Sequence, residues 1–301
     1  MGAASTVLLK NVDHALPLRK PRSMTLIGSD LGPSLRGPNG FSDRGGLSGT
    51  LAMGWGSGTA QFPYLVDPLS SISRQAREDR TILNWWLDDW NLSNASYWAS
   101  VAEVAIVGIN SDSGEGYITV DNNEGDRNNL TAWNNGEELV KAVASANNNT
   151  IVIVHSVGPM IIEGWIDHPN ITAVLWAGLP GQESGDSLVD VLYGAYNPSA
   201  RLPYTIAKKR EDYSADIDYV TSDVPPITQV NYTEGLFIDY RHFLAKDITP
   251  RYEFGFGMSY TSFEFGDVFL EEIKEEGAKD DIYNFQEVDD GTVKAGRFLL
   301  D

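Results

Sequence analysis

The chain has 301 residues and a formal net charge of −20, from 42 acidic and 22 basic side chains. This acidic balance argues against nucleic acid and anionic membranes as partners, because proteins that bind them need a basic face. With 42% hydrophobic and 11% aromatic residues the chain can bury a sizeable core, which excludes an intrinsically disordered protein. The sequence contains no cysteine, which excludes disulfides, cysteine nucleophiles and iron–sulfur sites, and no apolar run reaches the roughly 18 residues of a membrane-spanning helix.

Short apolar runs alternate with helical patterns along the chain. Four runs rich in β-branched residues show little alternation and predict strands buried on both faces of a parallel sheet: Met24–Ile27, Val104–Ile109, Ile151–Val154 and Ala173–Trp176. Two segments with an apolar period of about 3.6 residues predict helices, Gly136–Ala146 and Glu183–Tyr193, the second closed by Gly194 as its carboxyl cap. Strands alternating with helices predict an α/β fold, a layered α/β/α sandwich with a mainly parallel sheet.

Five aromatic residues fall between Thr81 and Trp98, namely Trp85, Trp86, Trp90, Tyr97 and Trp98. Aromatic residues at such spacing usually pack against a sheet, and this is the interpretation we prefer. A platform for sugar rings is the alternative.

The segment after the second predicted strand carries the strongest functional signal. Glu115 lies between Gly114 and Gly116, shortly after a buried strand ends. This pattern presents a carboxylate at the carboxyl edge of an α/β sheet, where such sheets bind ligands, although a plain surface turn is the ordinary alternative. The chain then passes a second polar turn and reaches Asp126-Arg127.

The segment Asp112–Leu130 resembles the acid/base loop of fungal β-glucosidases of glycoside hydrolase family 3. Other stretches resemble the same family in the family's order: Val7–Asn11 with Leu16–Leu18, Gly54–Gly58, His155–Pro159, Trp176–Gly185 and Tyr252–Tyr260. The resemblance implies the C-terminal α/β sandwich domain of that family, over residues 1–266. Residues 267–301 are then an acidic tail, with one strand near Asp267–Leu270, or the start of a truncated linker to a fibronectin-like domain.

For the site, the resemblance implies that Glu115 is the general acid/base in retaining hydrolysis of terminal β-D-glucosyl residues. Ser57 then reaches the sugar in the deepest subsite, and Asp126 and Arg127 pair to brace the acid loop. Glu124 is the alternative acid, which we interpret as a solvated turn residue. The resemblance implies no cofactor, and the four histidines show no metal-ligand spacing; His155, which ends a predicted strand, is expected to be a core residue.

In family 3 the nucleophilic Asp lies on a preceding (β/α)8 barrel, which takes about 250 residues. Six residues precede Val7 here, so we expect this β-glucosidase-like chain to be inactive without such a barrel, joined in cis or bound in trans. The expected ligand is a β-glucoside or oligosaccharide. A non-catalytic sugar-binding or interaction module is the alternative function. An unrelated nucleotide-binding domain is disfavoured, because the glycine-rich loop at 54–58 lacks the Lys and Ser or Thr of a phosphate-binding loop.

The glycosylation sequons bear on the cellular compartment. Six glycosylation sequons favour a secreted protein, although Met1–Ser5 has no features of a signal peptide; they begin at Asn91, Asn94, Asn129, Asn148, Asn170 and Asn231.

Related fungal enzymes carry two cysteines where this chain has Phe41 and Gly46. The loop from Leu31 to Leu51 is therefore expected to be held by other contacts or to be looser.

Overall fold

A computed structural model describes residues 1–40, 48–54, 56–115, 127–217 and 230–268, together with the backbone at 119–120 and 123–124. The chain divides into two units, Met1–Ser262 and Phe263–Asp301. The described residues of the second unit, 263–268, form no helix or strand. The strand predicted near Asp267–Leu270 extends beyond the described residues, and Phe41 and Gly46 also lie outside them.

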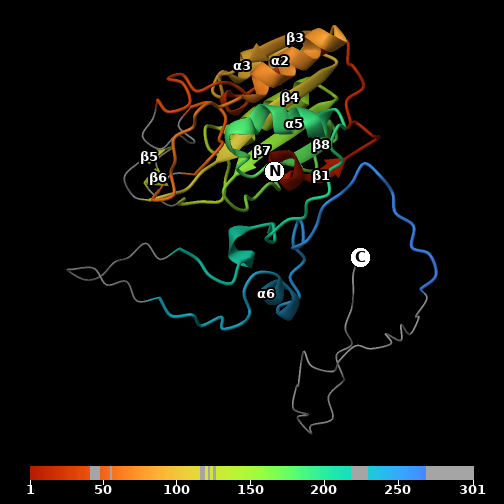
Figure 1. The fold of residues 1–301 in the computed structure, drawn as a ribbon. Helices are drawn as coiled ribbons and strands as arrows, with labels where there is room; N and C mark the ends of the chain where they lie inside the picture. The colour runs from red at the N-terminus through yellow and green to blue at the C-terminus, as the bar shows by residue number, and fades with distance from the viewer. Residues whose placement is uncertain are drawn as a thin grey trace, which may run out of the picture. The chain divides into compact units, whose positions relative to one another are not determined.

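The first unit is built on a six-stranded sheet with the order β1-β8-β7-β4-β2-β3 (Figure 1). The strands are β1 (Val7–Asn11), β2 (Ser23–Ile27), β3 (Ile82–Trp86), β4 (Val104–Ser111), β7 (Thr150–Ser156) and β8 (Ile171–Trp176). Four of the five neighbouring pairs are parallel, and the β1–β8 pair is antiparallel. The four predicted strands and the mainly parallel sheet are therefore confirmed.

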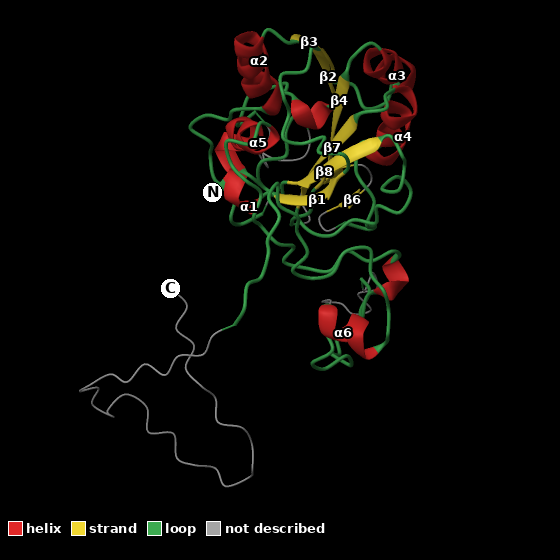
Figure 2. Cartoon of the chain, turned by 90° about the vertical axis from the view of Figure 1, so that its right-hand side faces the viewer, coloured by secondary structure: helices red, strands yellow, loops and turns green. Residues whose placement is uncertain are grey.

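Helices cover both faces of this sheet, which confirms the layered α/β/α sandwich (Figure 2). One face carries α1 (Gly2–Ser5), α2 (Pro68–Asp79) and α5 (Ser184–Leu192), and the other carries α3 (Leu92–Ser100) and α4 (Gly136–Ala146). Two apolar clusters fill the layers, one including Ile72 of α2 and Leu188 of α5, the other including Ala95 of α3 and Leu139 of α4. Both predicted helices are present, and α4 has the predicted limits.

The remaining elements are short. They are the 3-10 helices η1 (Ser29–Leu31), η2 (Gly181–Glu183) and η3 (Arg210–Asp212), the paired strands β5 (Thr119–Val120) and β6 (Asn123–Glu124), and helix α6 (Tyr240–Ala245). The bounds of the longer helices follow from local signals. Asp67 caps α2 by accepting a hydrogen bond from the amide of Ser70 at 3.0 Å, and Pro68 occupies its first turn. Gly194 follows α5 with φ of 76°, as a carboxyl-capping glycine requires.

The aromatic region lies at the β3 edge of the sheet. Trp86 packs against the core beside α3 and α4, as predicted. Trp85, Trp90 and Tyr97 are more than half exposed, so the interpretation of the group as core aromatics is wrong for these three. β3 is the last strand of the sheet, and each of its five residues is partly or largely exposed.

Next to this region, burial raises the pKa of Asp89 to about 6, although the amide and hydroxyl of Ser29 both donate to its carboxylate. The folded state therefore holds this proton more strongly than the unfolded state. The stabilisation is complete below about pH 4 and is lost as the pH rises through about 6, a change of at most about 3 kcal/mol. We expect Asp89→Asn to flatten the fall in unfolding free energy between pH 4 and pH 7, measured by urea unfolding. Asp88→Asn, at an exposed neighbour, is the control; an unchanged slope in Asp89→Asn would contradict the assignment.

Candidate active site

The candidate site lies where the parallel strands β2, β4 and β7 end. Three loops meet at this edge: the described residues 51–54 and 56–58, residues 112–115 directly after β4, and residues 157–159 directly after β7. The amide of Val157 donates to the carbonyl of Ser111 at 3.2 Å, which joins the second loop to the third. Because parallel strands place their carboxyl ends together, loops far apart in sequence converge here.

Glu115 and Ser57, both predicted from the sequence, are brought together in this arrangement although 58 positions separate them. The hydroxyl of Ser57 donates to Oε1 of Glu115 at 2.6 Å, and the backbone amide of Ser57 donates to the same oxygen at 3.1 Å. Gly56, immediately before Ser57, has φ of 133°, a conformation that side chains with a Cβ rarely adopt. The glycine therefore allows the turn that aims both donors at Glu115.

These two donors stabilise the ionised form of Glu115. They hold the pKa of the exposed Glu115 carboxyl below its usual value, with burial opposing them only weakly. A general acid needs the opposite environment, one that keeps the carboxyl protonated. In the chain by itself, the two donors of Ser57 thus favour the ionised form of Glu115 and oppose the protonated form that a general acid needs.

We expect Ser57→Ala to raise the pKa of Glu115 in the isolated chain, because it removes the first of the two donors. The shift should be partial, since the backbone amide of residue 57 remains. The side-chain carboxyl resonance of Glu115, followed by NMR against pH, measures it. Thr59→Ala is the matched control two residues further along, because the Thr59 hydroxyl is buried and has no hydrogen-bond partner among the described residues. Equal titration in both variants would show that Ser57 does not set the charge of Glu115.

Arg127, in the later part of the acid loop, is buried. Its guanidinium donates from Nη1 to the Ser111 hydroxyl and from Nη2 to the Pro159 carbonyl, each at 3.1 Å, and its backbone amide donates to Ser113. Burial lowers the pKa of Arg127. Arg127 thus connects the end of β4 to the loop after β7. Asp126 and the side chain of Glu124 lie outside the described residues, so the pairing of Asp126 with Arg127 stays a prediction.

A buried polar group beneath the three loops was not predicted as part of the site. Asp30, Asn110 and His155 are each at most 2% exposed. His155 is buried as predicted, and its Nδ1 forms a 2.6 Å hydrogen bond with Oδ2 of Asp30, while its Nε2 has no hydrogen-bond partner among the described residues. The sequence did contain a signal that could have pointed to Asp30, because this acid comes shortly after a predicted buried strand, as Asp112 does.

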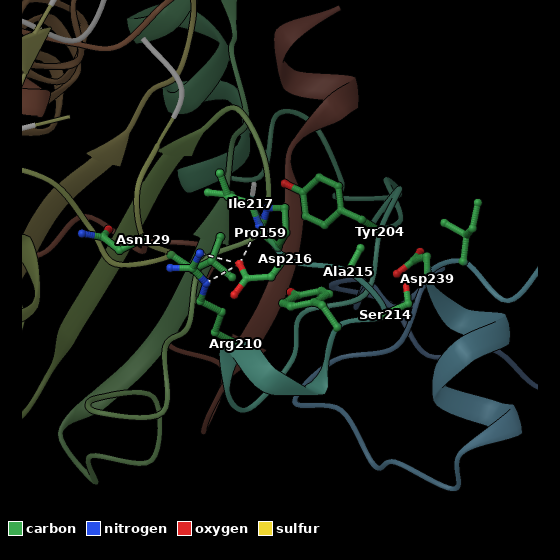
Figure 3. A pocket seen from close by; sticks show the side chains of 12 residues that line it. Asn129, Pro159, Tyr204, Arg210, Ser214, Ala215, Asp216, Ile217 and Asp239 are labelled. Atoms are coloured by element: carbon green, nitrogen blue, oxygen red, sulfur yellow. Dashed lines mark hydrogen bonds and ion pairs between the residues drawn. The ribbon is translucent and has the colours of Figure 1, made fainter. Parts of the chain in front are cut away.

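A pocket of about 420 Å³ lies beside Asn129 and Leu130, at the end of the acid loop (Figure 3). Its walls include Asn129, Pro159 and Tyr204, and Arg210 pairs with Asp216 at its edge. Neither Glu115 nor Ser57 lines it. In the described part of the chain, no group of three or more His, Cys, Asp or Glu side chains is placed to hold a metal ion, and no helix there has the length and apolarity to cross a membrane.

The sequence model of the glycosyl hydrolase family 3 C-terminal domain matches residues 6–260. The chain belongs to this family. Its similarity to curated proteins agrees: it is 56% identical over 275 residues to the probable β-glucosidase L of Neosartorya fischeri and 52% identical over 275 residues to β-glucosidase 1 of Aspergillus aculeatus. These alignments cover 91% and 90% of the chain but 36% and 32% of the relatives, so this family 3 chain spans about a third of their length.

Solved structures of β-glucosidases show the same fold. A β-glucosidase from Chaetomella raphigera superposes with a TM-score of 0.82 at 52% identity, over 87% of this chain and 36% of that one. A family 3 β-glucosidase from Neurospora crassa gives 0.85 at 48% identity, over 91% and 32%. β-Glucosidase 3B from Thermotoga neapolitana, in complex with glucose, gives 0.67 at 24% identity, a likeness of fold alone.

Proposed function

We propose that this family 3 domain supplies Glu115 as the general acid/base in retaining hydrolysis of terminal β-D-glucosyl residues. In this proposal a (β/α)8 barrel domain supplies the nucleophile. The observation that carries the proposal is the contact between Ser57 and Glu115 at the carboxyl edge of the sheet. The relatives' names support the reaction class, because they are β-glucosidases.

In the first step, protonated Glu115 donates its proton to the glycosidic oxygen. The C–O bond to the leaving group breaks while a carboxylate of the barrel forms a bond to the anomeric carbon. In the second step, the Glu115 carboxylate takes a proton from water, whose oxygen attacks the anomeric carbon. This releases the barrel carboxylate and the sugar with its original configuration. Arg127, and Asp126 with it, would act by holding the acid loop in place.

The state of Glu115 in the chain alone supports the need for a second domain. Glu115 is exposed here and its pKa is lowered, whereas the first step requires a protonated acid. A barrel packed over the site would bury the carboxyl and place a second carboxylate near it, and both effects raise a pKa. Exposed apolar side chains in the first unit are also consistent with a missing neighbour; between residues 230 and 254 they are Val230, Tyr232, Leu236, Phe237, Ile238, Tyr240, Leu244 and Phe254.

The proposal is tested by joining the chain to the barrel of a relative such as the Aspergillus aculeatus β-glucosidase. The chain alone is expected to show no turnover of an aryl β-glucoside, because it lacks covalent catalysis and most of the subsite. The joined protein is expected to be active, and the barrel alone is the control. If a folded joined protein remained inactive, the chain would instead be a non-catalytic sugar-binding or interaction module.

The proposal includes secretion. The acceptor asparagines of five sequons are exposed, at Asn91, Asn94, Asn129, Asn148 and Asn231. Asn170 is half-buried and its amide donates to the carbonyl of Ala144 at 2.8 Å, which disfavours its modification. Mass spectrometry of the protein from a fungal host would detect glycans on the first group, and their absence would count against secretion.

A further inference from the structure

Asp30 lies beneath the three loops of the site and contacts a residue that leads into each of them. It belongs to the 3-10 helix η1, which follows β2 through Gly28. At Gly28 the chain passes so close to β4 that an added Cβ would lie 2.4 Å from the carbonyl oxygen of Gly108. This close approach turns the chain under the sheet edge and leaves the Asp30 side chain 1% exposed.

Both carboxylate oxygens of Asp30 are used. Oδ1 accepts hydrogen bonds from the backbone amide of Leu51 at 2.9 Å and from Nδ2 of Asn110 at 3.0 Å. Oδ2 is 2.6 Å from Nδ1 of His155. A buried carboxylate with three such partners has a fixed position, because losing any one of them leaves a polar group unsatisfied away from water.

Each partner leads into a different loop. Leu51 begins the loop that carries Ser57. Asn110 is the last residue but one of β4, just before the acid loop. His155 lies in β7, just before the loop whose Pro159 carbonyl accepts a hydrogen bond from Arg127. Asp30 therefore fixes the bases of the two loops whose tips meet in the contact between Ser57 and Glu115.

We propose that Asp30 is a positioning residue for the acid/base group, holding the loops of Ser57 and Glu115 in register so that the carboxyl of Glu115 occupies one place. This inference rests on the proposed function of Glu115. It concerns the alignment of the proton donor, since Asp30 is buried below the loops and does not contact them at their tips.

Asp89 provides a matched control for this role. It is a second buried carboxylate beside η1, and among the described residues its carboxylate accepts hydrogen bonds from Ser29 and from neither loop. Asp89→Asn changes a buried charge in the same neighbourhood. It leaves the contacts of Asp30 with Leu51, Asn110 and His155 in place.

The first test uses the full chain alone. In the unaltered chain, the Ser57 amide resonance is expected to shift as Glu115 titrates, because this amide donates to the Glu115 carboxylate. Asp30→Ala is expected to abolish that coupling. Asp30→Asn should retain it, because the amide can still accept from Leu51 and Asn110 and can donate to the other tautomer of His155. Asp89→Asn should also retain it. Persistence of the coupling in folded Asp30→Ala would overturn the inference without involving any enzymatic activity.

The second test uses the chain joined to a barrel and compares cellobiose with an activated aryl β-glucoside. Asp30→Ala is expected to lower the ratio of the cellobiose rate to the aryl β-glucoside rate about tenfold, because a misaligned acid matters most for a poor leaving group. A variant that only destabilised the fold would lower both rates equally. If Asp30→Ala did not fold, Asn110→Ala, which removes one contact of Asp30, replaces it with the same expectation.

The rate ratios distinguish a failure of the proposed function of Glu115 from a failure of the role of Asp30. If Glu115→Ala left the ratio of rates unchanged, the proposed function itself would be wrong. If Glu115→Ala lowered the ratio while folded Asp30→Ala and Asn110→Ala did not, the role of Asp30 would be wrong and that of Glu115 would stand.

Discussion

In the chain joined to a barrel, Glu115→Ala is expected to lower the turnover of cellobiose by about 10²–10⁴-fold, the usual contribution of a general acid. The turnover of an activated aryl β-glucoside should fall much less in the first step. The phenol of such a substrate leaves without needing a full proton transfer, whereas the sugar leaving group of cellobiose does not. The measurement is the rate on each substrate under saturating conditions.

For the aryl substrate the slow step then becomes deglycosylation, because water has lost its general base. Added azide needs no base, so it is expected to restore the rate and to yield a β-glycosyl azide. Glu124→Ala in the same protein is the control and should change both rates only modestly. Rescue of Glu124→Ala but not of Glu115→Ala would show that the wrong acid was chosen, while membership of family 3 would be unaffected.

Gly28→Ala is expected to destabilise the folded chain by more than about 3 kcal/mol. Two costs combine: Gly28 has φ of 101°, and its new Cβ would lie 2.4 Å from the backbone oxygen of Gly108, which cannot move without distorting β4. Urea unfolding measures the change. Gly37→Ala separates the two costs, because Gly37 also has a positive φ, 79°, and an added Cβ there meets no described residue within 4 Å. Gly37→Ala should cost about 1–2 kcal/mol. Equal losses in the two variants would show that the clash with β4 is relieved.

Local patterns predicted much of the fold. Helix α4 forms at Gly136–Ala146 as predicted, because its apolar residues keep a helical period and Asn147 ends it in extended conformation. The buried runs became β2, β4, β7 and β8, since a strand covered on both faces carries apolar side chains on both faces and not only at alternate positions. The exposed Trp85, Trp90 and Tyr97 show the limit of this reasoning. Aromatic composition alone does not reveal that β3 is the last strand of the sheet.

The sequence predicted the residues of the candidate site but not the buried hydrogen bonds that hold its loops. Glu115 and Ser57 were identified from glycine-flanked loops that resemble family 3. The bond between Asp30 and His155 joins positions 125 apart, and nothing local in either segment signals the other. Such contacts depend on which strands are neighbours, and β2, β4 and β7 become neighbours only through the order of the sheet. The role of Arg127 likewise depends on the approach of the loop after β7.

The pairing of Leu8 with Met258 has a mechanical consequence. Leu8 lies in β1, and its carbonyl accepts a hydrogen bond from the amide of Met258 at 2.8 Å, so the path of the chain into the sheet and its path out of it run side by side. A force pulling on the chain at these two points would act on β1, the edge strand, before it reached the central strands. Contacts that follow Met258 would share the load, because the Ser259 hydroxyl and the Tyr260 amide donate to Asn197 and the Tyr260 hydroxyl donates to the carbonyl of Val191.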